Sequence, residues 1–332
     1  MYYQAVQVLR GIAATGVVFA HAAGFYPVNA HGEWDQLILL GAGGVDLFFV
    51  ISGFIMASIS RFFSHDPITP AEFFTRRIIR IVPLYWFYTT LFLAAYVLYG
   101  SRPDLWNALG SYLFVPYPRA NGAPYPVVAV GWTLNLEMMF YLVFGCSLLL
   151  DLRSRVVFVT GIILAFSAWA LLLPVSLWWE LWFANPLYLE FLYGMLIGWL
   201  TFNDFRLPQY AAWACVIGGF ALFPLFPDVR ALSWGLCSML IVLGAVSIKQ
   251  KMPALLILVG DASYSIYLSH LLIVPAAHAI LPVDDASLRI SLVVVISVAV
   301  GVLAYKWIEK PLLQFVRRAA LSVPREPRMR SR

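Results

Sequence analysis

Long apolar segments alternate with short polar stretches along the chain. The apolar segments approach the length of about 20 residues that an α-helix needs to cross the hydrocarbon core of a bilayer. This pattern predicts an all-α, polytopic membrane helical bundle with about ten transmembrane helices. The predicted spans are residues 5–26, 37–60, 82–100, 127–150, 156–173, 186–202, 211–226, 231–248, 255–281 and 288–310.

Lysine and arginine residues indicate how this bundle is oriented. When the N-terminus is placed inside, seventeen of the 22 Lys and Arg residues fall in the inner loops and the C-terminal tail. One more, Arg10, lies within the first span. Cytoplasmic loops of membrane proteins carry an excess of positive charge. Both termini are therefore predicted to be cytoplasmic. The outer loops hold the other four basic residues: Arg102, Arg119, Arg230 and Arg289.

Composition supports a membrane protein and excludes other classes. Hydrophobic residues make up 62% of the chain and charged residues 12%, whereas a soluble domain is about a quarter charged. The net charge of +5 does not indicate nucleic-acid binding, because the basic residues lie in loops where topology explains them. No metal site is predicted, because all three cysteines fall in apolar segments without metal-ligand spacing: Cys146, Cys215 and Cys237.

The two ends of the chain have their own interpretations. Residues 20–22 have the Ala-x-Ala form of a signal-peptidase site, but the first four residues carry no charged side chain and Arg10 interrupts the pattern. The first segment is therefore expected to remain as a span. The stretch 316–332 is expected to be a basic cytoplasmic tail that contacts anionic lipids. Residues 1–315 are then one transmembrane domain.

The first span carries two ionisable residues, Arg10 and His21. They are eleven residues apart, which puts them within about 20° of the same helix face and about 16 Å apart along the axis. Taken singly, Arg10 is explained as an anchor at the cytoplasmic boundary, and His21 as a neutral imidazole bonded to a carbonyl. Together on one face, they indicate a channel lined for an elongated charged ligand.

Asp46 lies in the outer half of the second span, in the segment GAGGVDLFFVISGF. At roughly the depth of His21, its carboxylate could orient the imidazole or stabilise the charged form. A structural hydrogen bond between spans is the alternative. Four glycines of the same segment would permit close helix approach: Gly41, Gly43, Gly44 and Gly53.

Arg77 and Arg80 precede the third span in the segment EFFTRRIIRIVPLYW. Three residues apart, they share a helix face at the cytoplasmic boundary, just before Pro83 opens the span. Two fixed guanidinium groups in this place suit phosphate recognition. The positive charge of inner loops also predicts arginines here, so both interpretations stand.

Other polar residues lie in the outer halves of later spans. Glu137 follows Trp132 and Asn135 in the fourth span, Glu190 lies at similar depth in the sixth, and His270 ends the run SYSIYLSH in the ninth. Arginines on the inside and His, Asp and Glu on the outside predict an asymmetric path across the bilayer. We expect substrate to be bound by Trp132, Asn135, Glu190 and His270.

Two remaining features have plainer interpretations. Glu309 stands between Lys306 and Lys310 at the end of the last span and is expected to form a local ion pair. Three tryptophans of an outer loop are expected to form an interfacial aromatic belt, with a sugar-stacking platform as the alternative: Trp178, Trp179 and Trp182.

Seven motifs occur in a familiar order: R-x10-H in the first span, GGVDLFFVISGF, FFTRRIIRIVPLYW, GWTLNLEMMFYL, NPLYLEFLYGM, SYSIYLSH and KWIEKPL. In this order they resemble the acyltransferase family 3 membrane proteins, and most of all the ExoZ-type branch of bacterial exopolysaccharide acetyltransferases. The resemblance runs from about residue 4 to residue 315. Single motifs are weak evidence, but seven in order are strong.

The resemblance implies an integral membrane O-acyltransferase of the bacterial inner membrane. It implies transfer of an acyl group, by default acetyl, from acyl-CoA (acetyl-CoA) to a sugar hydroxyl of a cell-surface glycan or exopolysaccharide precursor. Carried onto this sequence, Arg10 and His21 are the paired motif residues, and His21 is the essential one. Arg77 and Arg80 match the arginine motif, and Glu137 matches the acidic position of the W-[ST]-L-x-x-E motif.

These residues suggest a mechanism as a hypothesis. The donor phosphates rest on the three arginines at the cytoplasmic mouth, and the pantetheine arm follows the first helix outwards. His21 then acts as a general base on the acceptor hydroxyl or as a transient acyl carrier, while Asp46 or Glu137 holds its tautomer. The expected partners are acyl-CoA, a glycan or lipid-linked sugar acceptor and membrane lipids, with no nucleic acid and no tightly bound cofactor.

Two other functional classes stay open. A transporter or flippase of an anionic or lipid-linked sugar would explain the intramembrane charges but not the seven motifs. An inactive sensor or scaffold is opposed by the presence of both Arg10 and His21. Turnover of acyl-CoA separates the enzyme from both alternatives.

Overall fold

All regular secondary structure in the described residues is helical. The computed structural model describes residues 3–26, 34–100, 103–119, 122–174, 177–223 and 230–321. The predicted all-α class is confirmed. The α-helices are α1 Gln4–Ala23, α2 Asp35–Ala42, α3 Gly44–Ile59, α4 Pro70–Leu98, α5 Leu105–Tyr112, α6 Trp132–Ser147, α7 Leu152–Leu172, α8 Tyr188–Phe202, α9 Gln209–Leu222, α10 Arg230–Ser247, α11 Ala254–Asp261, α12 Ser263–Ile280, α13 Ala286–Ala304 and α14 Lys310–Leu321.

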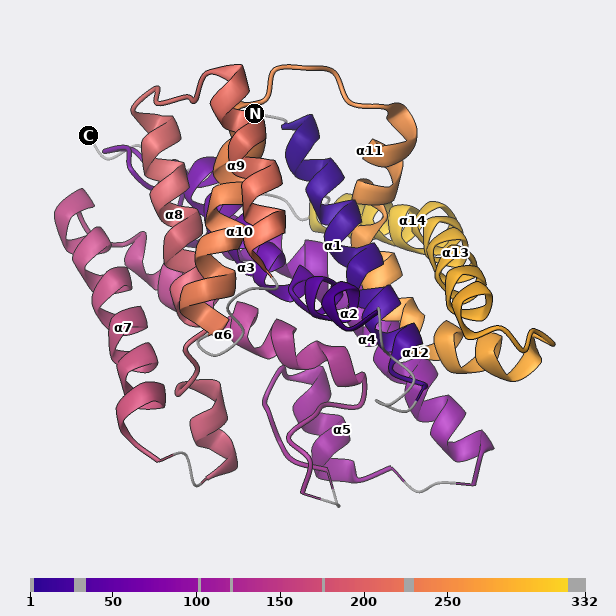
Figure 1. The fold of residues 1–332 in the computed structure, drawn as a ribbon. Helices are drawn as coiled ribbons and strands as arrows, with labels where there is room; N and C mark the ends of the chain where they lie inside the picture. The colour runs from indigo at the N-terminus through magenta and orange to yellow at the C-terminus, as the bar shows by residue number, and fades with distance from the viewer. Residues whose placement is uncertain are drawn as a thin grey trace.

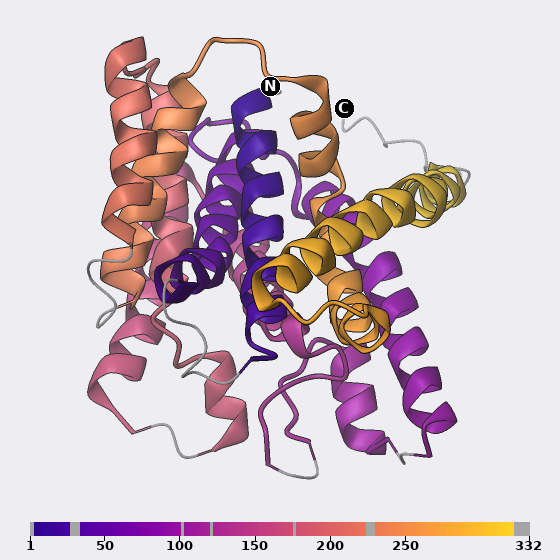
Figure 2. The same cartoon turned by 45° about the vertical axis from the view of Figure 1, so that its right-hand side comes forward.

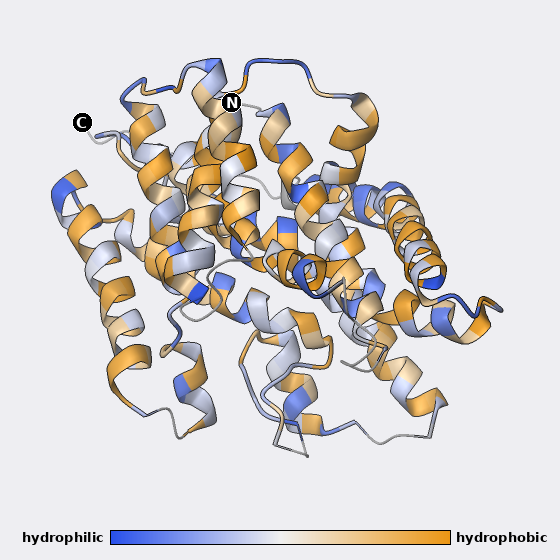
Figure 3. Cartoon of the chain, viewed as in Figure 1, coloured by the Kyte–Doolittle hydropathy of each residue, from blue (hydrophilic) through white to orange (hydrophobic). Residues whose placement is uncertain are grey.

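Seven helical segments among the described residues are long and apolar enough to cross a membrane. The pair α11 and α12, bent by 68°, passes as an eighth, and α8 and α9 are shorter apolar helices. Apolar residues dominate these ribbons (Figure 3). The protein is therefore a multi-pass membrane protein, and its helical segments coincide in position with the ten predicted spans. The number that cross the bilayer and the orientation of the termini stay predictions.

The connections lie at two opposite ends of the bundle. The start of α1 and the connections after α8 and α10 lie at one end, and α5 lies at the other (Figures 1 and 2). Following the predicted orientation, we call the first the inner end and the second the outer end. The predicted tail is described only as far as residue 321, where it continues α14; the remainder lies outside the described residues.

Helix α4 begins well before the predicted third span. Thr69 caps it by accepting a hydrogen bond from the backbone N–H of Glu72 at 3.2 Å, and Pro70 occupies its first turn. Both residues are favoured at these positions. The helix then continues through Pro83 to Leu98. Pro83 therefore does not open the span, and the two arginines lie inside a continuous helix of 29 residues.

Glycines allow α3 and α8 to approach closely at the centre of the bundle. A Cβ atom on Gly53 would lie 2.1 Å from the Phe191 carbonyl oxygen, and one on Gly194 would lie 2.0 Å from that of Val50. Only glycine fits such backbone contacts. The close approach predicted for the glycines of the second span is confirmed.

Helix α1, which carries Arg10 and His21, lies between several other helices of the bundle. It packs against α2, α3, α11, α12 and α13. Phe48 on α3 packs against each of the three apolar clusters of the core. Arg10, which is half-buried, and His21, which is exposed in the last turn, therefore lie on a helix that other helices surround.

Two irregular turns adjoin this centre. The chain breaks at Ala262 between α11 and α12, and a π-helical turn, Tyr305–Glu309, separates α13 from α14. Irregular backbone at membrane depth is tolerated where it is buried in protein or lines a cavity, and π turns are frequent at functional sites. Ser263 directly follows the first break, and Glu309 ends the π turn.

Candidate active site

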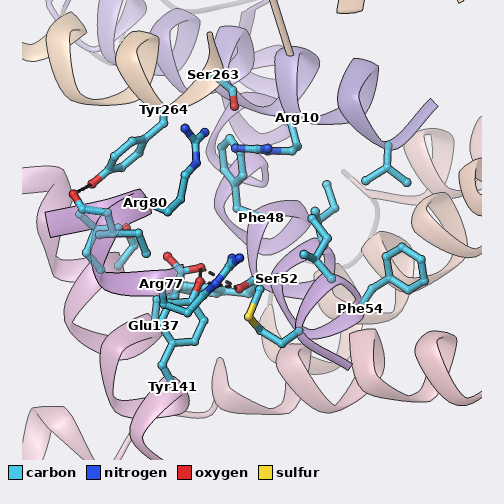
Figure 4. A pocket seen from close by; sticks show the side chains of 18 of the residues that line it. Arg10, Phe48, Ser52, Phe54, Arg77, Arg80, Glu137, Tyr141, Ser263 and Tyr264 are labelled. Carbon is cyan, nitrogen blue, oxygen red and sulfur yellow. Dashed lines mark hydrogen bonds between the residues drawn. The ribbon is translucent and has the colours of Figure 1, made fainter. Parts of the chain in front are cut away.

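A cavity of about 360 Å³ lies in the inner half of the bundle, between α1, α3, α4, α6 and α12. We call it the inner cavity. Its α1 side is formed by residues of the first two turns, which places it near the inner end. Its charged and hydrogen-bonding lining residues include Arg10, Ser52, Arg77, Arg80, Glu137, Tyr141, Ser263 and Tyr264 (Figure 4).

Three guanidinium groups from two helices converge on this cavity. Arg10 comes from α1, and Arg77 and Arg80 from α4. Arg10 donates to the amide oxygen of Gln7 at 3.3 Å, and Arg77 lies near Glu137 in Figure 4. The structure thus brings together all three residues predicted to bind the donor, although they are far apart in sequence. A concentration of fixed guanidinium donors suits a phosphate-bearing ligand.

Glu137 faces the inner cavity and is held by two hydroxyl groups. Ser52 donates to its Oε1 at 2.7 Å and Tyr141 donates to the same oxygen at 2.5 Å. The sequence predicts that either this carboxylate or that of Asp46 holds the tautomer of His21. The structure instead places it among the arginines, where it balances part of their charge.

Arg80 is anchored by the π turn. Glu309 is fully buried, forms an ion pair with Arg80 and accepts from the Ser265 hydroxyl at 2.6 Å. The guanidinium of Arg80 also lies over the ring of Tyr264, 5.8 Å from its centroid. The predicted local ion pair of Glu309 with its lysine neighbours is wrong, because the π turn directs the carboxylate into the bundle.

His21 lies in the last turn of α1, where its side chain is exposed. Its Nδ1 lies 2.9 Å from the backbone carbonyl oxygen of Val17. Because a carbonyl only accepts, this contact places a proton on Nδ1, so in the neutral ring Nε2 carries the lone pair. The tautomer is fixed by α1 itself, without the carboxylate that the sequence suggested.

Asp46 has a different partner from the one predicted. Its buried carboxylate accepts from Arg230 at 3.0 Å from Nε and 2.7 Å from Nη2. This fork-to-fork geometry is the strong form of an arginine–carboxylate pair. The expected contact with His21 is corrected accordingly. The sequence does not predict Arg230 as a site residue, because it is assigned to an outer loop. The signal that could have found it is the Asp46 carboxylate, since a charged group within a span usually pairs with another.

Glu190 lies beside this ion pair without joining it. The side chain is fully buried, and neither of its oxygens has a hydrogen-bond partner among the described residues. Asp46 and Arg230 are the charged groups that act on it electrostatically. Arg230 in turn lies over the ring of Trp234, 4.9 Å from its centroid.

The remaining predicted substrate residues on α6 differ in their surroundings. Asn135 is buried, and its side-chain amide has no hydrogen-bond partner within the described part of the chain. Its backbone carbonyl accepts from the indole N–H of Trp182 at 3.0 Å, so this tryptophan is tied to the bundle and is not a free belt residue. Trp132 is half-buried and packs against the largest apolar cluster.

Phe48 and Tyr267 mark the boundary between the inner cavity and the histidine. Both line the cavity, and their ring centroids are 5.8 Å apart. The Tyr267 hydroxyl lies 3.1 Å from the Val130 carbonyl oxygen and 3.0 Å from the Thr133 hydroxyl. On the far side of Tyr267 is His270, whose ring centroid is 4.8 Å from that of His21. The helix faces that line the cavity therefore continue to His21.

Comparison with known proteins identifies the family. The acyltransferase 3 family model, described as an acyltransferase domain, matches residues 3–306. The chain belongs to the acyltransferase 3 family. It is also similar to the exopolysaccharide production protein ExoZ of Rhizobium meliloti (strain 1021), with 38% identity over 300 residues that cover 83% of this chain and 90% of that protein. No solved structure matches the chain.

Membership of this family makes the protein an acyltransferase with many helices in the membrane. Among the described residues, no group of three or more His, Cys, Asp or Glu side chains could hold a metal ion.

Proposed function

We propose that the protein is an O-acyltransferase that moves an acyl group, acetyl in the simplest case, from cytoplasmic acyl-CoA to a sugar hydroxyl of an exopolysaccharide precursor. One observation carries this proposal. In a chain of the acyltransferase 3 family, helix α1 carries both Arg10, one of three arginines that line the inner cavity, and His21, whose Nδ1 is bonded to a backbone carbonyl so that Nε2 is the basic nitrogen of the neutral ring.

The inner cavity suits the phosphate-bearing end of acyl-CoA. Arg10, Arg77 and Arg80 supply charge-assisted donors to phosphate oxygens, and Glu309 keeps Arg80 in place. About 16 Å of helix separates Arg10 from His21, a distance suited to a long, thin arm between the phosphates and the thioester. The predicted cytoplasmic position of the inner end would give the cavity access to the donor.

His21 supplies the base that the reaction needs. Nε2 takes the proton of the acceptor hydroxyl while that oxygen attacks the thioester carbon. The tetrahedral intermediate collapses with loss of the carbon–sulfur bond, and the proton held by His21 passes to the sulfur. The products are the sugar ester and the free thiol of CoA, so atoms and charge balance.

The acceptor class rests on the similarity to the ExoZ protein, whose name records exopolysaccharide production. The outer polar groups are compatible with a sugar, because Asn135 and Glu190 hold unpaired hydrogen-bonding atoms. Buried polar groups without partners are costly, and hydroxyl groups of a substrate would satisfy them.

Mass spectrometry of the surface glycan tests this proposal. Base-labile O-acetyl groups are measured in wild type, in a deletion strain, and in the deletion strain complemented with His21→Ala at matched membrane levels. The matched control is His65→Ala, which changes an exposed histidine in the connection between α3 and α4.

We expect the acetyl mass step to disappear in the deletion and in His21→Ala, and to return with wild type and His65→Ala. Full acetylation with His21→Ala would contradict the mechanism and favour a transporter or flippase. Unchanged acetylation in the deletion would contradict the glycan acceptor.

A further inference from the structure

His270 is a fully buried histidine with unused hydrogen-bonding capacity. Its side chain is 0% exposed, and neither Nδ1 nor Nε2 has a hydrogen-bond partner among the described residues. The carbonyls of Ile266 and Tyr267 face it from the preceding turn, but neither meets the geometry of a hydrogen bond. A neutral imidazole always carries one N–H, and a buried donor left unpaired in a folded protein requires an explanation.

The position of His270 connects the inner cavity to His21. Ser263 and Tyr267, both lining the cavity, lie seven and three residues before it on α12, so the three share one helix face. The His270 ring meets the His21 ring edge to face, with centroids 4.8 Å apart and planes at 63°. On the proposed route from the cavity to His21, the thioester therefore passes beside His270.

Another histidine on the same helix shows what a structural role looks like. His278 lies two turns further along α12, and its Nε2 is 3.0 Å from the Ala22 carbonyl oxygen. Its ring also stacks on Phe25, with centroids 4.7 Å apart. His278 thus has both a hydrogen-bond partner and a packing partner. His270 lacks the first, and it is the one that lies next to the proposed base.

We propose that His270 is a catalytic residue whose ring N–H stabilises the oxyanion of the transferred acyl group; this inference rests on the proposed acyl transfer. As the acceptor oxygen bonds to the thioester carbon, the carbonyl π electrons move to the carbonyl oxygen. The N–H of His270 donates to that oxygen. When the carbon–sulfur bond breaks, the electrons return and the carbonyl of the new ester re-forms.

A neutral donor is the appropriate group beside this base. His21 becomes positively charged when it takes the proton of the acceptor, and a second charged imidazole in contact with it would repel that charge. A neutral N–H stabilises the oxyanion without this penalty. In the cavity, Phe48 is half-buried, and its ring centroid lies 5.8 Å from that of Tyr267, the cavity residue three positions before His270.

Steady-state kinetics of purified protein in nanodiscs tests the proposal. The donor is acetyl-CoA, the acceptor is the exopolysaccharide fraction isolated from the deletion strain, and release of CoA thiol is followed. The variants are His270→Phe, which keeps an aromatic ring but has no N–H, and His270→Asn, which restores an N–H donor. His278→Phe is the matched control on the same helix, and His21→Ala reports on the proposed base.

We expect His270→Phe to lower kcat by about 10²- to 10³-fold, the usual loss when one oxyanion donor is removed. The KM for acetyl-CoA should stay within about twofold of wild type, because the arginines that bind the donor are untouched. His270→Asn should recover part of kcat, and His278→Phe should match wild type.

Other outcomes separate the two proposals. Wild-type kcat with His270→Phe, while His21→Ala is inactive, would overturn the oxyanion role and leave the proposed function intact. Equal losses with Phe and Asn, accompanied by a raised KM, would overturn it in favour of a structural role. No thiol release by wild type would contradict the proposed function itself, and the oxyanion role with it.

Discussion

The inner and outer halves of the polar path differ in the hydrogen bonds that their glutamate and histidine side chains make. In the inner half, Glu137 and Glu309 each accept at least two hydrogen bonds from the protein. In the outer half, Glu190 and His270 have no hydrogen-bond partner within the described residues. The inner half also contains the cavity. Phe48 and Tyr267 line the cavity at the end that faces the outer half.

This difference indicates a division of work along one helix. In the inner half the two carboxylates are held by hydrogen bonds from the protein, whereas Nε of Arg77, which lines the same cavity, has no partner among the described residues and is available to a ligand. In the outer half Asp46 is paired with Arg230, whereas Glu190 and His270 keep polar atoms that a reacting substrate would satisfy. Under the proposed function, donor binding falls at Arg10 and the chemistry at His21, at different depths along α1.

The largest expected effect comes from the chemical end. His21→Ala should lower the rate of acyl transfer by about 10²- to 10⁴-fold, because general-base catalysis contributes this much. Thiol release from acetyl-CoA in nanodiscs measures it. A residual rate within tenfold of wild type would remove His21 from the mechanism and end the division between the two halves.

The binding end should respond through KM. Arg77→Gln is expected to raise the KM for acetyl-CoA by about 10- to 100-fold, since a hydrogen bond to a charged group contributes about 1.5–3 kcal/mol. The neighbouring Arg76→Gln is the matched control, because Arg76 is exposed and pairs with Glu72. Equal KM values for the two variants would show that the cavity does not bind the donor phosphates.

The ion pair of the outer half should contribute to stability. Arg230→Gln leaves the buried Asp46 carboxylate without its partner, and we expect a loss of about 2 kcal/mol, reduced from the value for a fully buried pair because the Arg230 side chain is 36% exposed. Thermal unfolding in detergent measures it. Adding Asp46→Asn should restore part of the loss, and the absence of any restoration would argue against the pair.

The smallest expected effect is on the melting temperature, where Glu190 and Asp46 variants should differ. Glu190→Gln keeps a polar side chain of the same size and removes the like-charge interaction with Asp46, so the melting temperature should stay unchanged or rise. Asp46→Asn alone should lower it. A loss of stability in Glu190→Gln equal to that in Asp46→Asn would mean that both carboxylates are structural.

The sequence predicts the helical architecture and the convergence of distant arginines, but it does not predict partners. Periodicity and apolar length suffice to place helices, because lipid allows only chains whose backbone groups are paired internally. The pairing of Asp46 with Arg230 depends on the contact of α3 with α10, and that of Arg80 with Glu309 on a π turn. Neither the helix contact nor the π turn can be read from local sequence.

Equilibrium binding of CoA to His21→Ala and Arg10→Gln in nanodiscs tests the separation of binding from chemistry most directly. The account predicts that His21→Ala binds CoA as tightly as wild type although it does not turn over, and that Arg10→Gln binds about 10- to 100-fold more weakly. Wild-type affinity in Arg10→Gln together with lost binding in His21→Ala would contradict it.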